Sequence, residues 1–252
     1  MTGAGLDGLV FDFLLVLARL SGLLLFVPGL GDVTVPMPVR AALAAVLAVL
    51  VLSAVRPMLP LWPGTPWLVA RDVAVELLIG AWLGLIARLV ADALAMAGQI
   101  MSYMIGLSNV LVPERAGGGQ TGVLAQIYGL VPPLLLFSTG LYIVPLSGIV
   151  ASYRLLPAGG GLAAPDALAV LVRAATAGFA LAVRLALPFL LAHTLWQIMV
   201  GAAGRLAPAL QLPMLAFPGQ LLGGLLLLWL AAPSLIHVWF AALPGFLAPV
   251  GF

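Results

Sequence analysis

The sequence predicts an all-α protein that is embedded in a membrane and built from hydrophobic, kinked helical hairpins. Of its 252 residues, 64% are hydrophobic and only 7% are charged, whereas about a quarter of the residues of an ordinary soluble domain are charged. Mean hydropathy is +1.25, and apolar runs near the roughly 20 residues that cross a bilayer recur along nearly the whole chain. Because no hydrophilic stretch is long enough for a soluble domain, we treat residues 1–252 as a single domain.

The composition also argues against several classes of function. All ten basic residues are arginines, and they exceed the acidic residues by only two, so nucleic acid is not an expected partner. The chain contains no cysteine and only two histidines, His193 and His237, which are too far apart in sequence to share one helical face. Neither a nucleophile elbow nor a phosphate-binding loop occurs. We therefore expect no enzyme activity, no cofactor and no metal site.

The first half of the chain contains three long apolar runs. The first spans about residues 9–27 and ends at Pro28-Gly29, which do not readily continue a helix. The second spans about 39–55, and a loop with four prolines follows it at 57–66. The third spans about 67–90, and a weaker, more polar stretch at 91–112 leads into a glycine-rich segment that ends at residue 119. We expect this last segment to be flexible.

The second half contains three more runs, at about 123–150, 167–200 and 214–243. Pro132-Pro133 and Pro145 interrupt the first of these, which predicts kinked or separate helical pieces. The run at 167–200 is too long for one untilted span. Six simple crossings and fewer crossings with helical hairpins both fit this pattern. Arginines fall on both sides of a six-span arrangement, so they do not predict an orientation.

Ionisable side chains inside apolar runs are costly in lipid and need a partner. Asp72 and Glu76 are four residues apart on a predicted helix and would repel each other unless a cation lies nearby. Arg71, or an arginine from another helix, could supply that cation. Asp12 and Arg19 are predicted to share a helical face, where they form a polar seam or each pair with another chain.

Two further features of the third run concern pairing and packing. Arg88 and Asp92 have opposite charges at helical spacing and are expected to pair locally. We favour structural pairing over proton or ion transport for each of these charged groups. Gly80 and Gly84 lie on one helical face, where two backbones can approach closely. This pattern indicates helix packing and carries no information about activity.

Several segments, in order, resemble the FliR family of flagellar export-gate components, which is similar to the SctT proteins of type III secretion systems. The resemblance covers about residues 11–230, and its most characteristic part runs from Gly204-Arg205 through Pro208 to Gln211. The other matching segments are Ala18–Gly22, Pro28–Gly31, Val35–Arg40, Glu76–Gly80 with Gly84, Ala97–Gln99, Gly106–Ser108, Phe137–Gly140, Ser152–Pro157 and Arg184–Pro188. Each segment is weak alone, but their order and spacing are specific.

The resemblance implies a non-enzymatic subunit of an export gate that assembles with FliP and FliQ homologues, and with FlhB and FlhA homologues. The gate would pass unfolded flagellar proteins across the bacterial inner membrane at the basal body, raised towards the periplasm. The equivalent SctT subunit of an injectisome and, from another class, a self-contained ion or solute carrier are the alternatives. For the carrier, Arg71, Asp72 and Glu76 would line the site.

The resemblance also assigns roles to particular residues. A segment from about 106 to 119 would plug the closed channel and exclude water and ions, although an ordinary connecting loop fits the glycines equally well. The residues of this plug or gate would be Met101, Met104, Gly106, Leu107, Ser108, Asn109, Val110 and Leu111. Subunit-interface or buried charges would be Arg19, Arg71, Asp72, Glu76, Arg88 and Arg205.

Overall fold

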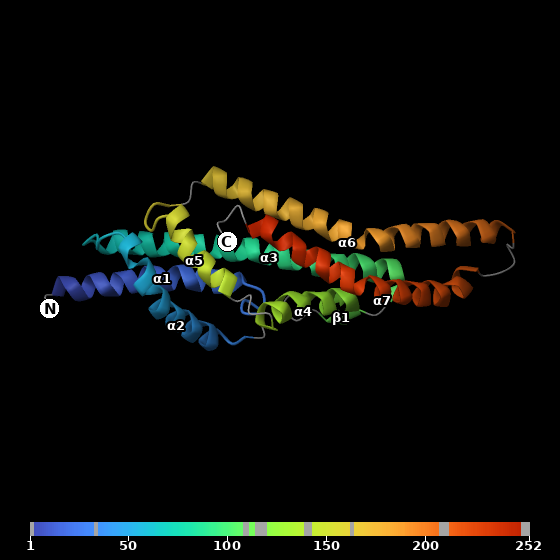
Figure 1. The fold of residues 1–252 in the computed structure, drawn as a ribbon, viewed down its shortest axis with the longest axis horizontal. Helices are drawn as coiled ribbons and strands as arrows, with labels where there is room; N and C mark the ends of the chain where they lie inside the picture. Colours follow the sequence, from blue (N-terminus) through green and yellow to red (C-terminus); the bar gives the residue numbers. More distant parts are fainter. Residues whose placement is uncertain are drawn as a thin grey trace. The chain divides into compact units, whose positions relative to one another are not determined.

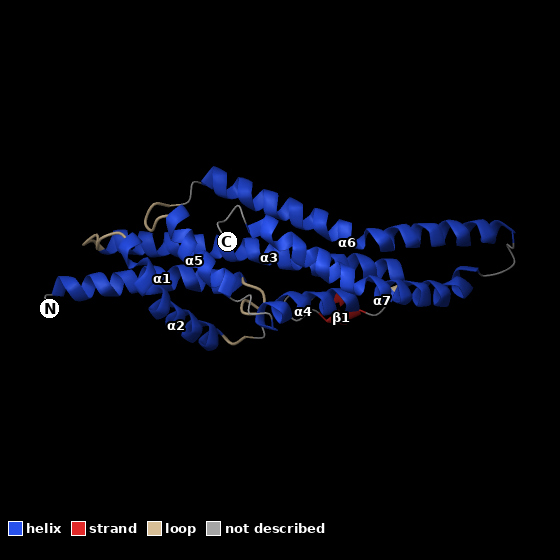
Figure 2. Ribbon diagram, viewed as in Figure 1, coloured by secondary structure: helices blue, strands red, loops and turns tan. Residues whose placement is uncertain are grey.

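The chain is almost entirely helical (Figures 1 and 2). The computed structural model describes residues 3–32, 35–107, 111–113, 120–138, 143–161, 164–206 and 212–247. The helices are α1 (Gly3–Phe26), α2 (Met37–Val55), the 3-10 turn η1 (Arg56–Met58), α3 (Pro66–Ile105), α4 (Val123–Ser138), α5 (Ile143–Leu155), α6 (Ala164–Leu206) and α7 (Leu212–Leu247). The short strands β1 (Leu111–Pro113) and β2 (Gln120–Gly122) form one antiparallel pair. The predicted all-α class is confirmed.

One predicted boundary was wrong, and one predicted division was confirmed. The third run and the weaker stretch after it form one continuous helix, α3, of 40 residues. Its polar residues lowered the hydropathy without ending the helix, because Gln99 Oε1 and Ser102 Oγ accept hydrogen bonds from the backbone of the β2–α4 segment. The run at 123–150 divides into α4 and α5, as the interrupting prolines predicted. Pro145 lies in the first turn of α5, where the missing N–H would have no helical partner.

Five helices of the described residues are long and apolar enough to cross a membrane. They are Gly5–Phe26, Met37–Met58, Pro66–Ile105, Pro165–Leu206 and Ala216–Pro244. The apolar part of α4, Val123–Leu135, is shorter. The described part of the chain therefore offers five candidate spans instead of the six runs read from the sequence.

The chain forms two compact units. Unit 1 consists of Met1–Val90, Pro132–Ala175 and Pro244–Phe252, and unit 2 consists of Ala91–Val131 and Thr176–Leu243. The core of unit 1 is made by α1, α2, the first part of α3, α5 and the start of α6, with Leu20, Ile79 and Tyr153 fully or almost fully buried. In unit 2 the buried side chains include Met101, Ile105 and Phe189.

Candidate functional site

A buried ionic centre in unit 1 joins three helices through one arginine. Arg19 of α1 is completely buried, and its Nε lies 2.5 Å from Oε2 of the equally buried Glu76 of α3. Its Nη1 donates to Ser152 Oγ at 3.0 Å, and its Nη2 donates to the Leu156 carbonyl oxygen at 3.0 Å. One guanidinium group therefore joins α1, α3 and the end of α5.

Each charge of the ionic centre has one further contact. The Arg19 guanidinium carbon lies 3.7 Å from the centre of the Tyr153 ring, in cation–π geometry. The Gly159 N–H donates to Glu76 Oε1 at 3.4 Å. Burial raises the pKa of the Tyr153 phenol above its ordinary value; Arg19 lowers it and Glu76 raises it further. The phenol therefore stays neutral, and the centre contains one positive and one negative group.

The two carboxylates predicted to repel each other have separate cations. Glu76 is paired with Arg19, and Arg71 Nη2 lies 2.8 Å from Asp72 Oδ1. Arg71 itself is about half exposed, since 53% of its side chain is accessible. The sequence left two possible counterions, Arg71 or an arginine of another helix, and the structure uses both. Both ion pairs lie within this chain.

Close backbone packing brings Arg19 and Glu76 together. A Cβ atom on Gly80 of α3 would overlap the Arg19 carbonyl oxygen, and one on Gly84 would lie 2.6 Å from the Leu23 carbonyl oxygen. A Cβ on Gly22 of α1 would likewise collide with the backbone of α3. The two helices can cross at this separation only where no side chain stands between them.

Other charged residues of unit 1 also have partners that helical spacing did not predict, and the expected pair of Arg88 with Asp92 stays a prediction. Asp12 lies 3.3 Å from Arg56 Nε, so the polar seam expected between Asp12 and Arg19 does not form. Arg88 Nη1 donates to Asp32 Oδ1 at 2.7 Å, across 56 positions in sequence. Asp32 also accepts a hydrogen bond from Arg40 through its carbonyl oxygen. These partners come from loops and neighbouring helices, which helical spacing cannot reveal.

The residues assigned to the plug begin at the C-terminal end of α3 in unit 2. Met101 is completely buried, and Met104 is partly buried. Gly106 follows the helix with a φ of 91°, a left-handed conformation that favours glycine. Leu111 belongs to β1. Ser108, Asn109 and Val110 lie outside the described residues, as do residues 114–119. The gate roles of all the predicted plug residues, Leu107 included, stay predictions.

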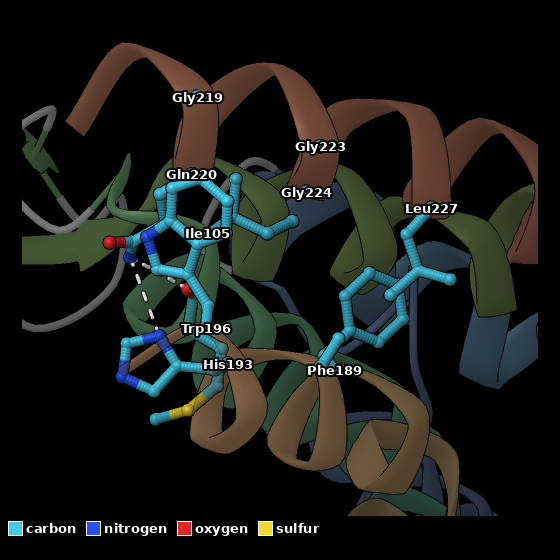
Figure 3. Close-up of a pocket in the computed structure, with 11 residues that line it drawn as sticks. Ile105, Phe189, His193, Trp196, Gly219, Gln220, Gly223, Gly224 and Leu227 are labelled. Carbon is cyan, nitrogen blue, oxygen red and sulfur yellow. Dashed lines mark hydrogen bonds between the residues drawn. The ribbon is translucent and has the colours of Figure 1, made fainter. Parts of the chain in front are cut away.

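Polar side chains fix the position of the helix end and of the β2–α4 segment. Gln220 Nε2 of α7 donates to the Met104 carbonyl oxygen at 3.0 Å and lies 3.4 Å from His193 Nδ1 of α6 (Figure 3). On α3, Gln99 Oε1 accepts from the Gly122 N–H at 2.8 Å. One hydrogen bond therefore holds the end of α3, and the other holds the returning β2 segment against α3.

A mostly apolar cavity of about 260 Å³ lies beside Gln220. Phe189, Trp196 and Leu227 line it together with Ile105, and the labelled side chains in Figure 3 converge on it. No group of three or more His, Cys, Asp or Glu side chains that could hold a metal ion occurs among the described residues.

Comparison with known proteins places the sequence in a family. The family model for bacterial export proteins, family 1, matches residues 10–244. The chain belongs to this family. Among its relatives, the flagellar biosynthetic protein FliR of Caulobacter vibrioides is 29% identical over 91% of this chain and 92% of the relative. FliR of Escherichia coli K12 is 27% identical over 84% of this chain and 80% of the relative. FliR of Aquifex aeolicus is 28% identical over 89% of this chain and 86% of the relative.

Family membership confirms the resemblance found in the sequence. As a bacterial export protein of the FliR type, the chain is a membrane-embedded component of flagellar export. The remaining predicted site residue, Arg205, is exposed near the end of α6. No pattern in the sequence predicts a role for Tyr153, Asp32 or Gln220. Each of them has a partner that is distant in sequence. Hydropathy could have indicated only that a polar side chain in an apolar run needs a partner, and not which residue that partner is.

Proposed function

We propose that this chain is the non-enzymatic FliR subunit of the flagellar export gate, where it forms with FliP and FliQ homologues a channel for unfolded proteins across the bacterial inner membrane. FlhA and FlhB homologues would adjoin this gate at the basal body, on an assembly raised towards the periplasm. The relatives compared above are flagellar, which supports the flagellar system over an injectisome.

The observation that carries this proposal is the apolar surface of α7. In the span Ala216–Pro244, only 6% of the most apolar window is buried inside the chain. Trp229 is 74% exposed, Leu222 is 68% exposed and Leu230 is 62% exposed. Exposed apolar patches of this kind mark surfaces that other molecules cover. Partner helices of a gate would supply that cover.

The paired charges of unit 1 favour a structural role over a self-contained carrier. A carrier site needs ionisable groups that are free to bind a solute. Glu76 and Asp72 instead accept hydrogen bonds from Arg19 and Arg71 of the same chain. Transport of a solute by the purified chain alone in vesicles would contradict the gate proposal and favour the carrier.

Co-purification with FliP and FliQ homologues tests the assembly. The tagged wild-type chain should retain both partners, and Trp229→Glu should lose them because a carboxylate would be buried without a counterion. Trp229→Leu is the matched control, since it keeps the surface apolar and should retain the partners. A wild-type chain that purifies alone after co-expression with both homologues would refute the assembly.

The segment that follows α3 is proposed as the gate. Met104 and the residues beyond Gly106 would contribute to the constriction, while the buried Met101 would hold the helix end in place. Deletion of residues 114–119 should leave the complex assembled and raise its ion conductance in a planar bilayer. A serine–glycine replacement of the same length separates loss of side chains from loss of length. Unchanged conductance in the assembled deletion complex would exclude the gating role.

A further inference from the structure

The part of α6 that belongs to unit 2 presents one charged side chain on an otherwise apolar surface. Arg184 is exposed, and it is the one charged residue of the sequence between Arg173 and Arg205. The neighbours along its face, Ala180 one turn before and Leu187 one turn after, are exposed and apolar. This stretch of the exposed face therefore carries a single cation.

The helical period keeps this cation away from the interior of unit 2. Ala182, Ala186 and Phe189 are buried, and by their spacing they lie on the opposite side of α6. The Phe189 side chain points into the cavity described above (Figure 3). Arg184 could reach this interior only if α6 turned by about half a revolution, which would expose the three buried side chains.

Arg184 differs from several arginines of unit 1 because it has no counterion in its own chain. Arg19, Arg56 and Arg71 each pair with a carboxylate. No residue that the structure describes forms an ion pair or a hydrogen bond with Arg184. An arginine in an apolar run is costly unless another group takes its N–H donors. That group must come from outside the described part of this chain.

Pro188 adds a hydrogen-bond acceptor beside these donors. It lies inside α6, where its ring has no N–H to bond the Arg184 carbonyl oxygen four residues earlier. Pro188 is exposed, and a helical carbonyl group points along the axis towards the residue four positions later. One turn of α6 therefore offers guanidinium donors together with a backbone carbonyl oxygen that has lost its usual helical donor.

The side chains around Arg184 suit the approach of another helix. Ala177 and Ala180 are exposed and lie two turns and one turn before Arg184 on its side of α6. Such small side chains let two helix backbones come close together. On the other side of Arg184, the exposed Leu187 and Leu191 offer apolar contact area. A helix packed along this face would exclude water from Arg184.

Lipid headgroups are a poor source of the missing acceptor at this position. Headgroups lie where apolar surface ends, yet apolar surface continues on both sides of Arg184. Phe179 before it is 57% exposed, and Leu195 and Ile198 after it are 67% and 63% exposed. Arg184 also lies about 30 Å from either end of the 43-residue helix α6, so water at the ends of the helix does not solvate it.

We infer that Arg184 anchors a contact between subunits, in which it binds a carboxylate on a helix of a neighbouring chain. A carboxylate matches the charge of the guanidinium group and accepts two of its N–H groups at once. A hydroxyl or amide donor beside that carboxylate would bond the Arg184 carbonyl oxygen. This inference rests on the proposed function, because the neighbouring chain is a subunit of the gate.

Cross-linking can identify the carboxylate because the chain contains no lysine. Arg184→Lys introduces one lysine amine, and this variant would be co-expressed with the FliP and FliQ homologues. Dicyclohexylcarbodiimide, added to the purified complex, joins an amine to a carboxylate in contact with it, with loss of water. Mass spectrometry should find an amide between position 184 and an aspartate or glutamate of a partner subunit. Arg154→Lys is the control and should join no other chain, since Arg154 lies in the last turn of α5, where helix carbonyl groups stabilise a cation.

Charge reversal measures what the contact contributes to assembly. Arg184→Glu should reduce the retention of partner subunits on the tagged chain several-fold, because two carboxylates would then face each other without a counterion. Replacement of the cross-linked partner acid by arginine should restore retention in the double variant. The isolated Arg184→Glu chain should unfold in detergent micelles at the wild-type temperature, which would place the defect in assembly and not in folding.

Two results would overturn the inference while leaving the proposed function intact. Wild-type retention of the partners by Arg184→Glu would show that no partner carboxylate lies against this residue, and would leave the guanidinium group to lipid headgroups or water. An amide from position 184 to a carboxylate of this same chain would place the contact within one subunit. A wild-type chain that retains neither homologue would instead refute the proposed function, and this inference with it.

Discussion

The two units of this chain satisfy their polar groups in different ways. Unit 1 contains most of the charged residues and pairs several of them internally, with Arg19 and Glu76 fully buried at the crossing of α1 and α3. Unit 2 contains few charged residues, and its described polar contacts are largely amide, hydroxyl and imidazole bonds such as those of Gln99, Ser102 and Gln220. Its helix α7 leaves most of its apolar surface uncovered.

This difference indicates a division of tasks within one short chain. A buried ion pair fixes geometry strongly, because each charge is unstable without the other. Uncharged hydrogen bonds contribute roughly 1 kcal/mol each and can be exchanged at lower cost. Unit 1 therefore suits a fixed body, whereas unit 2 suits the partner contact and the rearrangement that the proposed gate requires. The following variants test this contrast.

The largest effect should come from breaking the buried ion pair. Arg19→Met leaves Glu76 buried without a counterion, which should lower the free energy of unfolding by about 3–5 kcal/mol. Thermal unfolding of the purified full chain in detergent micelles measures this loss. Arg19→Met with Glu76→Leu should recover much of it, because both charges are then absent. The exposed Arg184→Met in unit 2 should change little.

This prediction places the defect in the chain itself. Because Ser152 and the Leu156 carbonyl also bind Arg19 within unit 1, the loss should appear before any partner is added. A variant of normal stability alone that fails only during assembly would indicate pairing between chains and contradict the intrachain assignment.

The next largest effect should come from a glycine substitution, which we expect to destabilise unit 1 but not unit 2. Gly80→Ala places a Cβ against the Arg19 carbonyl oxygen, and since backbone cannot rotate away, the helices must shift. Overpacking of this kind costs about 1–3 kcal/mol. Gly223→Ala in α7 meets no atom within 4 Å and should be neutral or slightly stabilising. Equal melting temperatures for the two variants would show that the close crossing in unit 1 is not required.

Sequence patterns predicted the local features of this molecule and missed the distant ones. Apolar runs located the helices, and the spacing of Gly80 and Gly84 indicated the face on which α3 packs, because both depend on neighbours along one helix. The partners of Arg19 lie 57 and 133 positions away, and that of Met104 lies 116 positions away. Tertiary packing brings such partners together, so the periodicity of a single helix cannot predict them.

The same reasoning explains the error in α3. Gln99 and Ser102 made the stretch after residue 90 look like the end of a span, yet each bonds to a segment that folds back onto the helix. Hydropathy counts a polar side chain as a cost regardless of whether the protein supplies its partner. Long helices that pack against their own loops are therefore divided too readily by hydropathy alone.

A smaller effect is expected where α7 holds the end of α3. Gln220→Met removes the donor to the Met104 carbonyl oxygen, a loss of about 1 kcal/mol, or about fivefold in a local opening equilibrium. Hydrogen–deuterium exchange of a peptide covering residues 103–113 should accelerate accordingly. Gln197→Met, which removes only a 3.4 Å contact to His193, should leave that peptide unchanged. Equal exchange in both variants would remove Gln220 from any role at the helix end.

The smallest effect should come from the exposed charges of unit 1. The Arg56 side chain is 58% accessible and lies 3.3 Å from Asp12, so water and salt weaken their attraction. Arg56→Gln should lower the stability of the full chain by less than about 1 kcal/mol. The difference between this variant and the wild type should shrink further as salt is raised, whereas the defect of Arg19→Met should persist because ions do not reach a buried pair. If both defects responded equally to salt, the distinction between a sealed ionic centre and a rim of solvated charges in unit 1 would fail.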